Sequence, residues 1–108
     1  MSDIHNQLET LINTHPVVLF MKGTQQTPQC GFSARAVFIL QRLGVPFHDV
    51  NVLADNTIRE GIKVYSNWPT IPQLYVKGEF IGGADIMTEM FQAGELHTLF
   101  GLPSPAQS

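Results

Sequence analysis

The feature that most constrains the fold of this chain is an apolar run, Val17-Val18-Leu19-Phe20-Met21, that passes into a polar loop and then a helix. A run without polar alternation is typical of a strand buried on both faces in the centre of an α/β sheet. The loop over 22–29 carries glycine and proline and ends at Cys30, the only cysteine in the chain. Residues 33–40 predict the start of a helix. The sequence therefore predicts a strand–loop–helix unit with one thiol at the helix N-terminus.

The position of Cys30 favours a reactive thiolate over the bland alternative, an inert and buried small apolar residue. Backbone N–H groups and the macrodipole at a helix N-terminus stabilise an anion and lower the pKa of a thiol. Lys22, at the end of the predicted strand, adds a positive charge nearby. Because Cys30 lies in a loop marked by glycine and proline, we interpret it as functional.

Periodicity and capping signals predict the elements on either side of this unit. A first helix, with Asp3 as its N-cap and Pro16 as its end, carries one apolar stripe at helical spacing. The stripe consists of Ile4, Leu8, Leu11 and Ile12. The helix after Cys30 ends before Gly44 and is apolar on almost every side, so we expect much of it to be buried. Residues 47–52 predict a second strand, parallel to the first through a right-handed crossover.

A third helix is predicted to start between Asp55 and Thr57, with Thr57 and Glu60 spaced as a capping box. Arg59 and Lys63 lie four residues apart on a face that is solvent-exposed by default. Gly61 lowers the stability of this helix by about 1 kcal/mol relative to alanine.

The last third of the chain predicts a hairpin and two helices. Residues 73–76 and 79–81 flank a tight turn at Lys77-Gly78. Asp85 is predicted to cap a helix that stops at Gly94, and a short helix over 95–100 follows. The chain is thus an α/β protein with a four-stranded mixed sheet and helices on both faces. We expect one domain over 1–108, with 102–108 as a flexible tail.

Composition limits the classes of function. With 108 residues, 44% hydrophobic and 14% charged, the chain is expected to bury a real core. A net charge of −3 and scattered basic residues argue against nucleic acid as the main partner. Residues 1–7 resemble no leader, no apolar run approaches a membrane span, and one cysteine makes no internal disulfide, so we expect a cytoplasmic protein. The four histidines are scattered in the sequence without metal-ligand spacing.

Four motifs occur in order between residues 16 and 100. They are Lys22-Gly23, Cys30-Gly31-Phe32-Ser33, Trp68-Pro69-Thr70-Ile71-Pro72 and Gly82-Gly83-Ala84-Asp85. Each is weak alone, but together they resemble the monothiol glutaredoxins of the Cys-Gly-Phe-Ser class, in particular single-domain bacterial members. The resemblance implies a thioredoxin-like fold.

The resemblance also implies a glutathione site. In it Cys30 binds glutathione or ligates iron, Lys22 pairs with the thiolate or a carboxylate, and Arg59 holds the glycyl carboxylate. A cis proline in 70–72 leaves the preceding backbone free to pair with the peptide part of glutathione. The N-terminus of the next helix takes the γ-glutamyl carboxylate, and Asp85 accepts from the ammonium. The implied site residues are Lys22, Cys30, Phe32, Arg59, Thr70, Ile71, Pro72, Gly83, Ala84 and Asp85.

Four of the residues in these motifs and in the implied site also have an ordinary explanation. Lys22 suits a strand end, Arg59 a solvated helix face, Trp68 simple packing, and Asp85 a helix cap. One departure from the family pattern is Ala84, where many relatives carry cysteine or serine. Second-thiol chemistry at that position is therefore absent.

The presence of one cysteine per chain limits the redox and metal chemistry that the protein can perform. Ser33 stands where a C-x-x-C motif has its second cysteine, so the chain cannot reduce disulfides by a dithiol mechanism. A [2Fe–2S] cluster with thiolate ligands needs four, of which a symmetric dimer supplies two. The other two come from small thiols or from a different protein. The family resemblance implies a homodimer that bridges one cluster through Cys30 of each chain and two glutathione thiols.

Two functions from different classes remain. The first, which we favour, is a glutathione-dependent carrier of [2Fe–2S] clusters, with apoproteins and a BolA-like protein as partners. The second is a monothiol glutathione–disulfide oxidoreductase, in which Cys30 attacks a glutathionyl sulfur and free glutathione resolves the intermediate. The resemblance implies that the long loop over 24–29 accompanies cluster binding and weak oxidoreductase activity.

Overall fold

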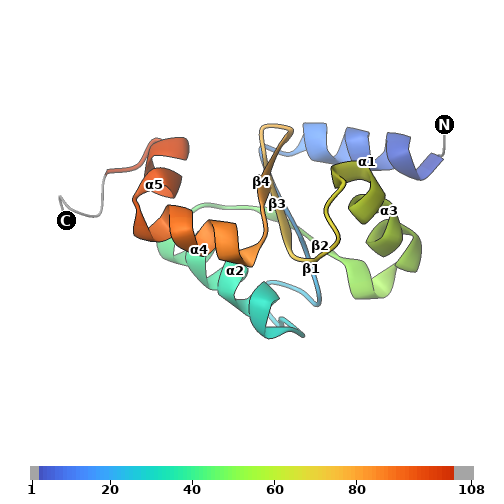
Figure 1. Ribbon diagram of the computed structural model, residues 1–108, viewed down its shortest axis with the longest axis horizontal. Coiled ribbons are helices and arrows are strands. Elements are labelled where there is room, and N and C mark those ends of the chain that lie inside the picture. The colour runs from blue at the N-terminus through green and yellow to red at the C-terminus, as the bar shows by residue number, and fades with distance from the viewer. Residues whose placement is uncertain (1–2, 104–108) are drawn as a thin grey trace.

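The apolar run forms an inner strand of a four-stranded sheet in the order β2-β1-β3-β4. The computed structural model describes residues 3–103 (Figure 1). Its strands are β1 Val17–Met21, β2 His48–Asn51, β3 Gln73–Val76 and β4 Glu79–Gly82. β1 runs parallel to β2 and antiparallel to β3, which forms an antiparallel hairpin with β4. The predicted mixed sheet is confirmed.

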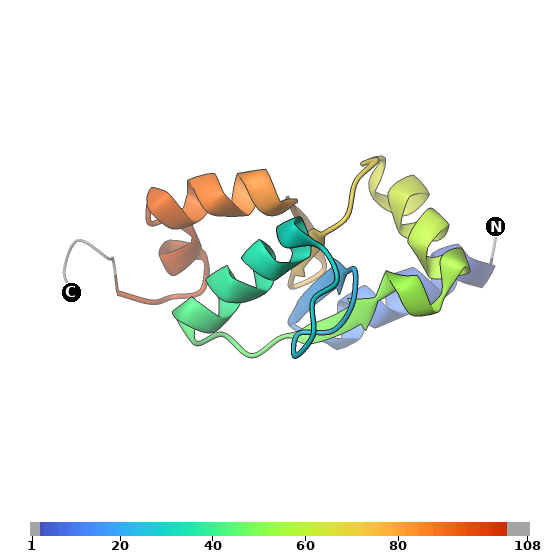
Figure 2. The same ribbon diagram turned by 90° about the horizontal axis from the view of Figure 1, so that it is seen from below.

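Five α-helices and one short 3-10 helix are present in the described residues. They are α1 Asp3–Thr14, α2 Gly31–Leu43, η1 Val52–Ala54, α3 Asn56–Ser66, α4 Ala84–Gln92 and α5 Glu95–Leu99. Helices α1 and α3 cover one face of the sheet, and α2 and α4 cover the other, with α5 against α4 (Figures 1 and 2). Helices on both faces are as predicted.

Strand β1 supplies both halves of the core because its side chains alternate between the two faces. Val17, Leu19 and Met21 pack with α2 and α4, whereas Val18 and Phe20 pack with α1 and α3. All five are buried. Each such side chain contributes roughly 1.5–3 kcal/mol of transfer free energy. The strand is thus the fixed base from which the thiol loop starts.

The predicted caps of α3 and α4 are wrong. Helix α3 is capped by Asp55, whose Oδ1 accepts from Thr57 N at 2.9 Å, because Thr57 is already inside the helix. Glu60 pairs with Lys63 instead, at 3.1 Å. Asp85 lies in the first turn of α4, whose N-cap has no side-chain bond. A short acidic side chain just before a helix and one just inside it look alike in sequence.

The start of α1 and the burial of α2 also differ from the prediction. Asp3 is the first residue of α1 rather than its cap. Helix α4 stops at Gly94 as predicted, because Ala93 is its C-cap and Gly94 follows in the left-handed conformation (φ 79°), where it is also the N-cap of α5. Helix α2 is less buried than predicted, since Phe32 and Phe38 are 58% and 59% exposed.

The close packing of α1 against α3 explains why a glycine, Gly61, occurs inside α3. A Cβ at this position would lie 2.7 Å from Cγ1 of Ile4. The absence of a side chain therefore lets α1 approach the helix that carries Arg59.

Two histidines and part of the predicted tail make contacts away from the thiol loop. His15 and His48, distant in sequence, stack with ring centroids 3.9 Å apart, although the described residues contain no group of three metal-ligating side chains. Of the predicted tail, Leu102 donates its N–H to His97 O at 2.7 Å, and 104–108 lie outside the described residues. None of the described helices has the length and apolar character needed to span a bilayer.

Candidate functional site

The loop between β1 and α2 is a closed, internally bonded hairpin. Gly23 and Pro28 form an antiparallel bridge, and Thr24 and Thr27 exchange backbone hydrogen bonds at 3.2 and 3.1 Å. Gly23 has φ 92°, and a Cβ there would lie 2.5 Å from the Thr27 carbonyl oxygen. Only glycine satisfies both the left-handed backbone and this contact. The chain thus returns to Cys30 along a defined path.

Two side chains of β2 that were not predicted as site residues hold this loop. Asn51 Oδ1 accepts from Gly23 N at 2.9 Å. Asp49 accepts from the backbone N of Gln25 at 2.8 Å and from its Nε2 at 3.1 Å. Two polar side chains at alternate positions of a strand that pairs with β1 were the available signal.

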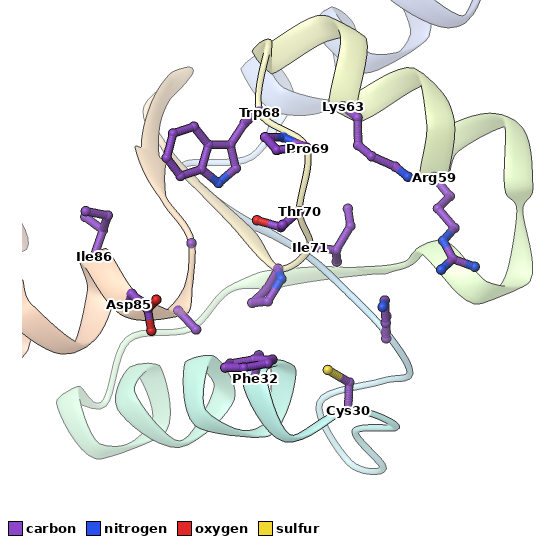
Figure 3. Close-up of a pocket in the computed structure, with 14 residues that line it drawn as sticks. Cys30, Phe32, Arg59, Lys63, Trp68, Pro69, Thr70, Ile71, Asp85 and Ile86 are labelled. Carbon is purple, nitrogen blue, oxygen red and sulfur yellow. The ribbon is translucent and has the colours of Figure 1, made fainter.

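Cys30 is the N-cap of α2, and its sulfur faces the cavity described below (Figure 3). The pKa of its thiol is lowered, chiefly by the backbone N–H of Ser33, which favours the thiolate. Partial burial opposes this, while the Phe32 N–H, the Lys22 charge and the Ser33 hydroxyl lower the pKa further. The helix start therefore favours a thiolate, as the position of the cysteine predicts.

Ser33 replaces a second cysteine and has a structural role of its own. It is fully buried, and its Oγ accepts from the backbone N of Lys22 at 3.0 Å. This bond ties the first turn of α2 to the end of β1. Ser33 thus fixes the two positions, 22 and 30, that carry the charge and the thiol.

A cavity of about 490 Å³ opens beside Cys30. Four parts of the fold supply its walls. The lining residues are Lys22, Cys30, Phe32, Arg59, Lys63, Trp68, Pro69, Thr70, Ile71, Pro72, Gly83, Ala84, Asp85 and Ile86. Figure 3 shows Cys30, the N-cap of α2, and Phe32 in its first turn across the cavity from Arg59 and Lys63 on α3. The structure thus brings all ten residues implied by the family resemblance to one cavity.

Residues 68–72 form one wall of the cavity, and a buried glutamine, Gln73, holds this segment in place. Gln73 Nε2 donates to the carbonyl oxygens of Trp68 and Thr70, each at 3.1 Å, and Gln73 is itself fully buried. Tyr75 donates its hydroxyl to Gln73 Oε1 at 3.2 Å, and burial raises the pKa of Tyr75 to about 12, so the donor stays protonated. The Ile71–Pro72 peptide bond is cis, as the resemblance implies.

The start of α4 forms the wall opposite Arg59. Gly83 is its N-cap without a side-chain bond, so the first N–H groups of the helix are not capped by this residue. A Cβ on Gly83 would lie 3.2 Å from the Pro72 carbonyl oxygen, which shows how closely the two walls approach. Ala84 is 5% exposed. Such a helix start is suited to a carboxylate.

The cavity is positively charged although the chain is acidic. Lys22, Arg59 and Lys63 line it, which is three of the six lysine and arginine residues in a chain of net charge −3. Asp85 adds a carboxylate at the opposite wall. Lys63 also pairs with Glu60, but an exposed pair of this kind contributes only about 0.2–1 kcal/mol. The cavity therefore suits a ligand with more than one carboxylate and an ammonium group.

Four lining residues were not predicted as site residues: Lys63, Trp68, Pro69 and Ile86. Lys63 follows Arg59 by one helical turn, and this spacing was the signal for a shared face. Trp68 and Ile86 are 39% and 36% exposed and, with the exposed Phe32, form an apolar rim of the cavity.

Comparisons with known proteins agree with this arrangement. The sequence model of the glutaredoxin family matches residues 17–81. The chain is 57% identical over 93 residues to an uncharacterized monothiol glutaredoxin ycf64-like of Synechocystis, covering 86% of this chain and 87% of the relative. It is 53% identical over 97 residues to the rice monothiol glutaredoxin-S11, covering 90% of this chain but only 20% of that longer protein.

The solution structure of reduced poplar apo GrxS14 superposes with a TM-score of 0.78 at 50% identity, covering 89% of this chain and 88% of that one. The fold is thus thioredoxin-like, as predicted. These matches and the single thiol at the start of α2 lead to one assignment: the chain belongs to the glutaredoxin family, as a monothiol glutaredoxin.

Proposed function

We propose that this monothiol glutaredoxin binds a [2Fe–2S] cluster together with glutathione and passes it to acceptor proteins. The cluster is the cargo, bridged in a homodimer by Cys30 of each chain and two glutathione thiols. The observation that supports the proposal is a single thiol of lowered pKa beside a cationic cavity. A protein with this site can offer one thiolate and hold one small anionic thiol next to it.

The cavity supports glutathione as the second thiol. Lys22 and Arg59 line the cavity and can hold the glycyl carboxylate, while the N-terminus of α4 and Asp85 suit the γ-glutamyl end. Ser33 has a hydroxyl already bonded to the backbone of Lys22, so no second protein ligand stands next to Cys30 in that position. Four thiolates per cluster then require two chains and two glutathione molecules.

The apolar rim supports a dimer around the cargo. Phe32, Trp68 and Ile86 are exposed at the mouth of the cavity. A cluster bound between two copies of Cys30 would bring two such rims together and bury aromatic side chains that are otherwise in water. An acceptor apoprotein, or a BolA-like protein, would replace one copy at the same surface.

Anaerobic reconstitution with iron, sulfide and glutathione tests the proposal. We expect visible absorption bands of a [2Fe–2S] cluster and a mass of two chains, and neither when glutathione is omitted. A Cys30→Ser variant serves as the control and should stay colourless. Cluster formation in normal yield without glutathione would refute the four-thiolate account.

The lowered pKa of Cys30 also favours the second candidate, a glutathione–disulfide oxidoreductase. The Cys30 thiolate would attack the glutathionyl sulfur of a mixed disulfide and release the other thiol. Glutathione would then take the glutathionyl group from Cys30 as glutathione disulfide and restore the thiolate. Rapid turnover of a glutathione mixed disulfide by a protein that stays a colourless monomer in every reconstitution would establish this function and exclude the carrier.

A further inference from the structure

A single oxygen atom links the two segments that supply opposite walls of the cavity. Asn51 Oδ1 accepts from Gly23 N at 2.9 Å and from Leu53 N at 3.0 Å. Gly23 lies in the loop that leads to Cys30, and Leu53 lies in η1, which leads directly into α3. Asn51 therefore stands where the thiol side and the Arg59 side of the cavity meet.

The bond to Gly23 cannot be lost without a change in the loop. Gly23 is buried and its bond to Asn51 is partly buried, so removing the Asn51 side chain leaves this N–H without its protein acceptor in a poorly solvated place. A buried donor without a partner is costly, and the loop would rearrange to satisfy it. The rearrangement would move Lys22 and the path to Cys30, because Gly23 also forms the bridge to Pro28.

We propose that Asn51 is a positioning residue that sets the separation between the Cys30 thiol and the cationic face of α3. Glutathione spans this separation, with its sulfur at Cys30 and a carboxylate at Arg59. This inference rests on the glutathione site of the proposed function, but it requires neither iron nor a dimer. Asp49 also holds the loop in place, because it accepts hydrogen bonds from the backbone N and the Nε2 of Gln25.

The test uses two variants that each disturb the cap of one short helical segment. Asn51→Ser keeps a short hydroxyl able to cap η1 at Leu53 but cannot reach Gly23. Asp55→Ala removes the cap of α3 and leaves the bonds of the loop in place. Comparing the two separates the loss of the loop contact from a loss of helix capping.

The measured quantity is the equilibrium constant for exchange of the Cys30 thiol with glutathione disulfide, which yields the protein–glutathione disulfide and one glutathione. Intact mass spectrometry across ratios of glutathione disulfide to glutathione gives it directly. We expect Asn51→Ser to lower the constant by about tenfold, because both ends of the ligand can no longer be held at once. Asp55→Ala should stay within about twofold. An unchanged constant in Asn51→Ser would overturn the proposal.

A double substitution distinguishes positioning from a general structural defect. If Asn51 acts through the placement of Arg59, the fold-loss caused by Arg59→Ala should be smaller in the Asn51→Ser background than in the unmodified protein. The same Arg59→Ala loss in both backgrounds would overturn the proposal. The pH profile of Cys30 alkylation should shift no further than in a Lys22→Ala variant, because the N–H of Ser33, the largest influence on the pKa of Cys30, remains.

Hydrogen exchange of the unmodified protein keeps the proposal testable if the variants fail to fold. The Gly23 amide should exchange far more slowly than the amide of the exposed Gln26 in the same loop. Equal rates would show that the Asn51 bond does not hold in solution and would overturn the inference. If the protein passes this test but its Cys30 forms no mixed disulfide with glutathione, the proposed glutathione site is refuted instead.

Discussion

Opposing effects act on the thiol of Cys30, and their balance gives it a lowered pKa. The backbone N–H of Ser33 is the largest influence and stabilises the thiolate, whereas partial burial favours the thiol. The charge of Lys22 adds to the first effect at longer range. Most of the activation thus comes from main-chain groups that no side-chain substitution removes, and Lys22 tunes it.

Replacing Lys22 with alanine should raise the pKa of Cys30 and slow its alkylation at neutral pH. The rate of reaction with iodoacetamide, followed against pH, gives the midpoint directly. Arg42→Ala removes an exposed charge from the last turn of α2 and should leave the midpoint unchanged. Equal shifts in the two variants would mean that overall charge, rather than the neighbourhood of Lys22, controls the thiol.

The same pKa makes stability depend on pH. Because the pKa of Cys30 is lower in the folded protein than in the unfolded chain, ionisation adds stability above the unfolded pKa, and this gain is lost as pH falls through the folded value. The free energy of unfolding of the protein relative to Cys30→Ser should therefore increase between roughly pH 6 and pH 9. Urea titrations at both pH values measure it, and a difference that is flat or falls with pH would contradict the lowered pKa.

Ser33 should contribute to stability as well as to the site. Ser33→Ala leaves the backbone N–H of Lys22 without its acceptor in a partly buried setting, at a cost of about 1 kcal/mol in the free energy of unfolding. Thr98→Ala also removes a hydroxyl hydrogen bond, but an exposed one, and should cost less than about 0.5 kcal/mol. Chemical denaturation of the two variants would show whether burial of the bond decides the difference.

At the scale of elements, local signals predicted most of the fold. The unbroken apolar run predicted β1, and the Lys77-Gly78 turn predicted the β3–β4 hairpin. Gly44 predicted the end of α2. The cap of α3 could not be assigned because Asp55, Asn56 and Thr57 are adjacent polar candidates for one helix start. The cap of α4 was misassigned because Asp85 lies one position inside the helix, after a glycine N-cap. Element existence depends on many residues, whereas a boundary depends on one or two.

For the candidate site, too, local features could be predicted from the sequence and long-range features could not. The motif residues could be named from sequence, but their meeting at one cavity depends on the β2-β1-β3-β4 order, which is not local. The bonds from Asn51 and Asp49 to the loop cross more than twenty positions in the chain. Nothing in a single strand pattern shows which distant N–H a polar side chain will accept.

Gly61 provides a test of how elements pack. Alanine would favour the helix by about 1 kcal/mol, yet its Cβ would lie 2.7 Å from Cγ1 of the partly buried Ile4. Overpacking costs about 1–3 kcal/mol, so we expect Gly61→Ala to lower the free energy of unfolding by about 1 kcal/mol. In an Ile4→Ala background the clash is gone, and the same substitution should stabilise the protein. Gly31→Ala meets no atom within 4 Å and serves as the unhindered control.

At the scale of the whole molecule, net charge and local charge have opposite signs. The chain has six basic and nine acidic residues, yet three of the basic ones gather at the cavity. An anionic ligand is therefore repelled at a distance and attracted on contact. A pair of charges about 4 Å apart interacts by about 4 kcal/mol at an effective dielectric of 20, whereas exposed charges beyond about 10 Å are largely screened at 0.1 M salt. The local attraction should dominate.

The salt dependence of thiol exchange shows whether local attraction by the cavity or long-range repulsion by the acidic chain dominates. Raising the salt concentration from about 0.1 to 1 M shortens the screening length from about 10 to 3 Å, so the equilibrium constant of Cys30 with anionic glutathione disulfide should fall severalfold. Exchange with the neutral 2-hydroxyethyl disulfide should change little, because the cavity charges have no partner on it. Arg59→Ala should flatten the response to glutathione disulfide. If salt instead raises the constant for glutathione, repulsion by the acidic chain outweighs the cationic cavity, and Lys22, Arg59 and Lys63 do not hold the ligand in the way proposed.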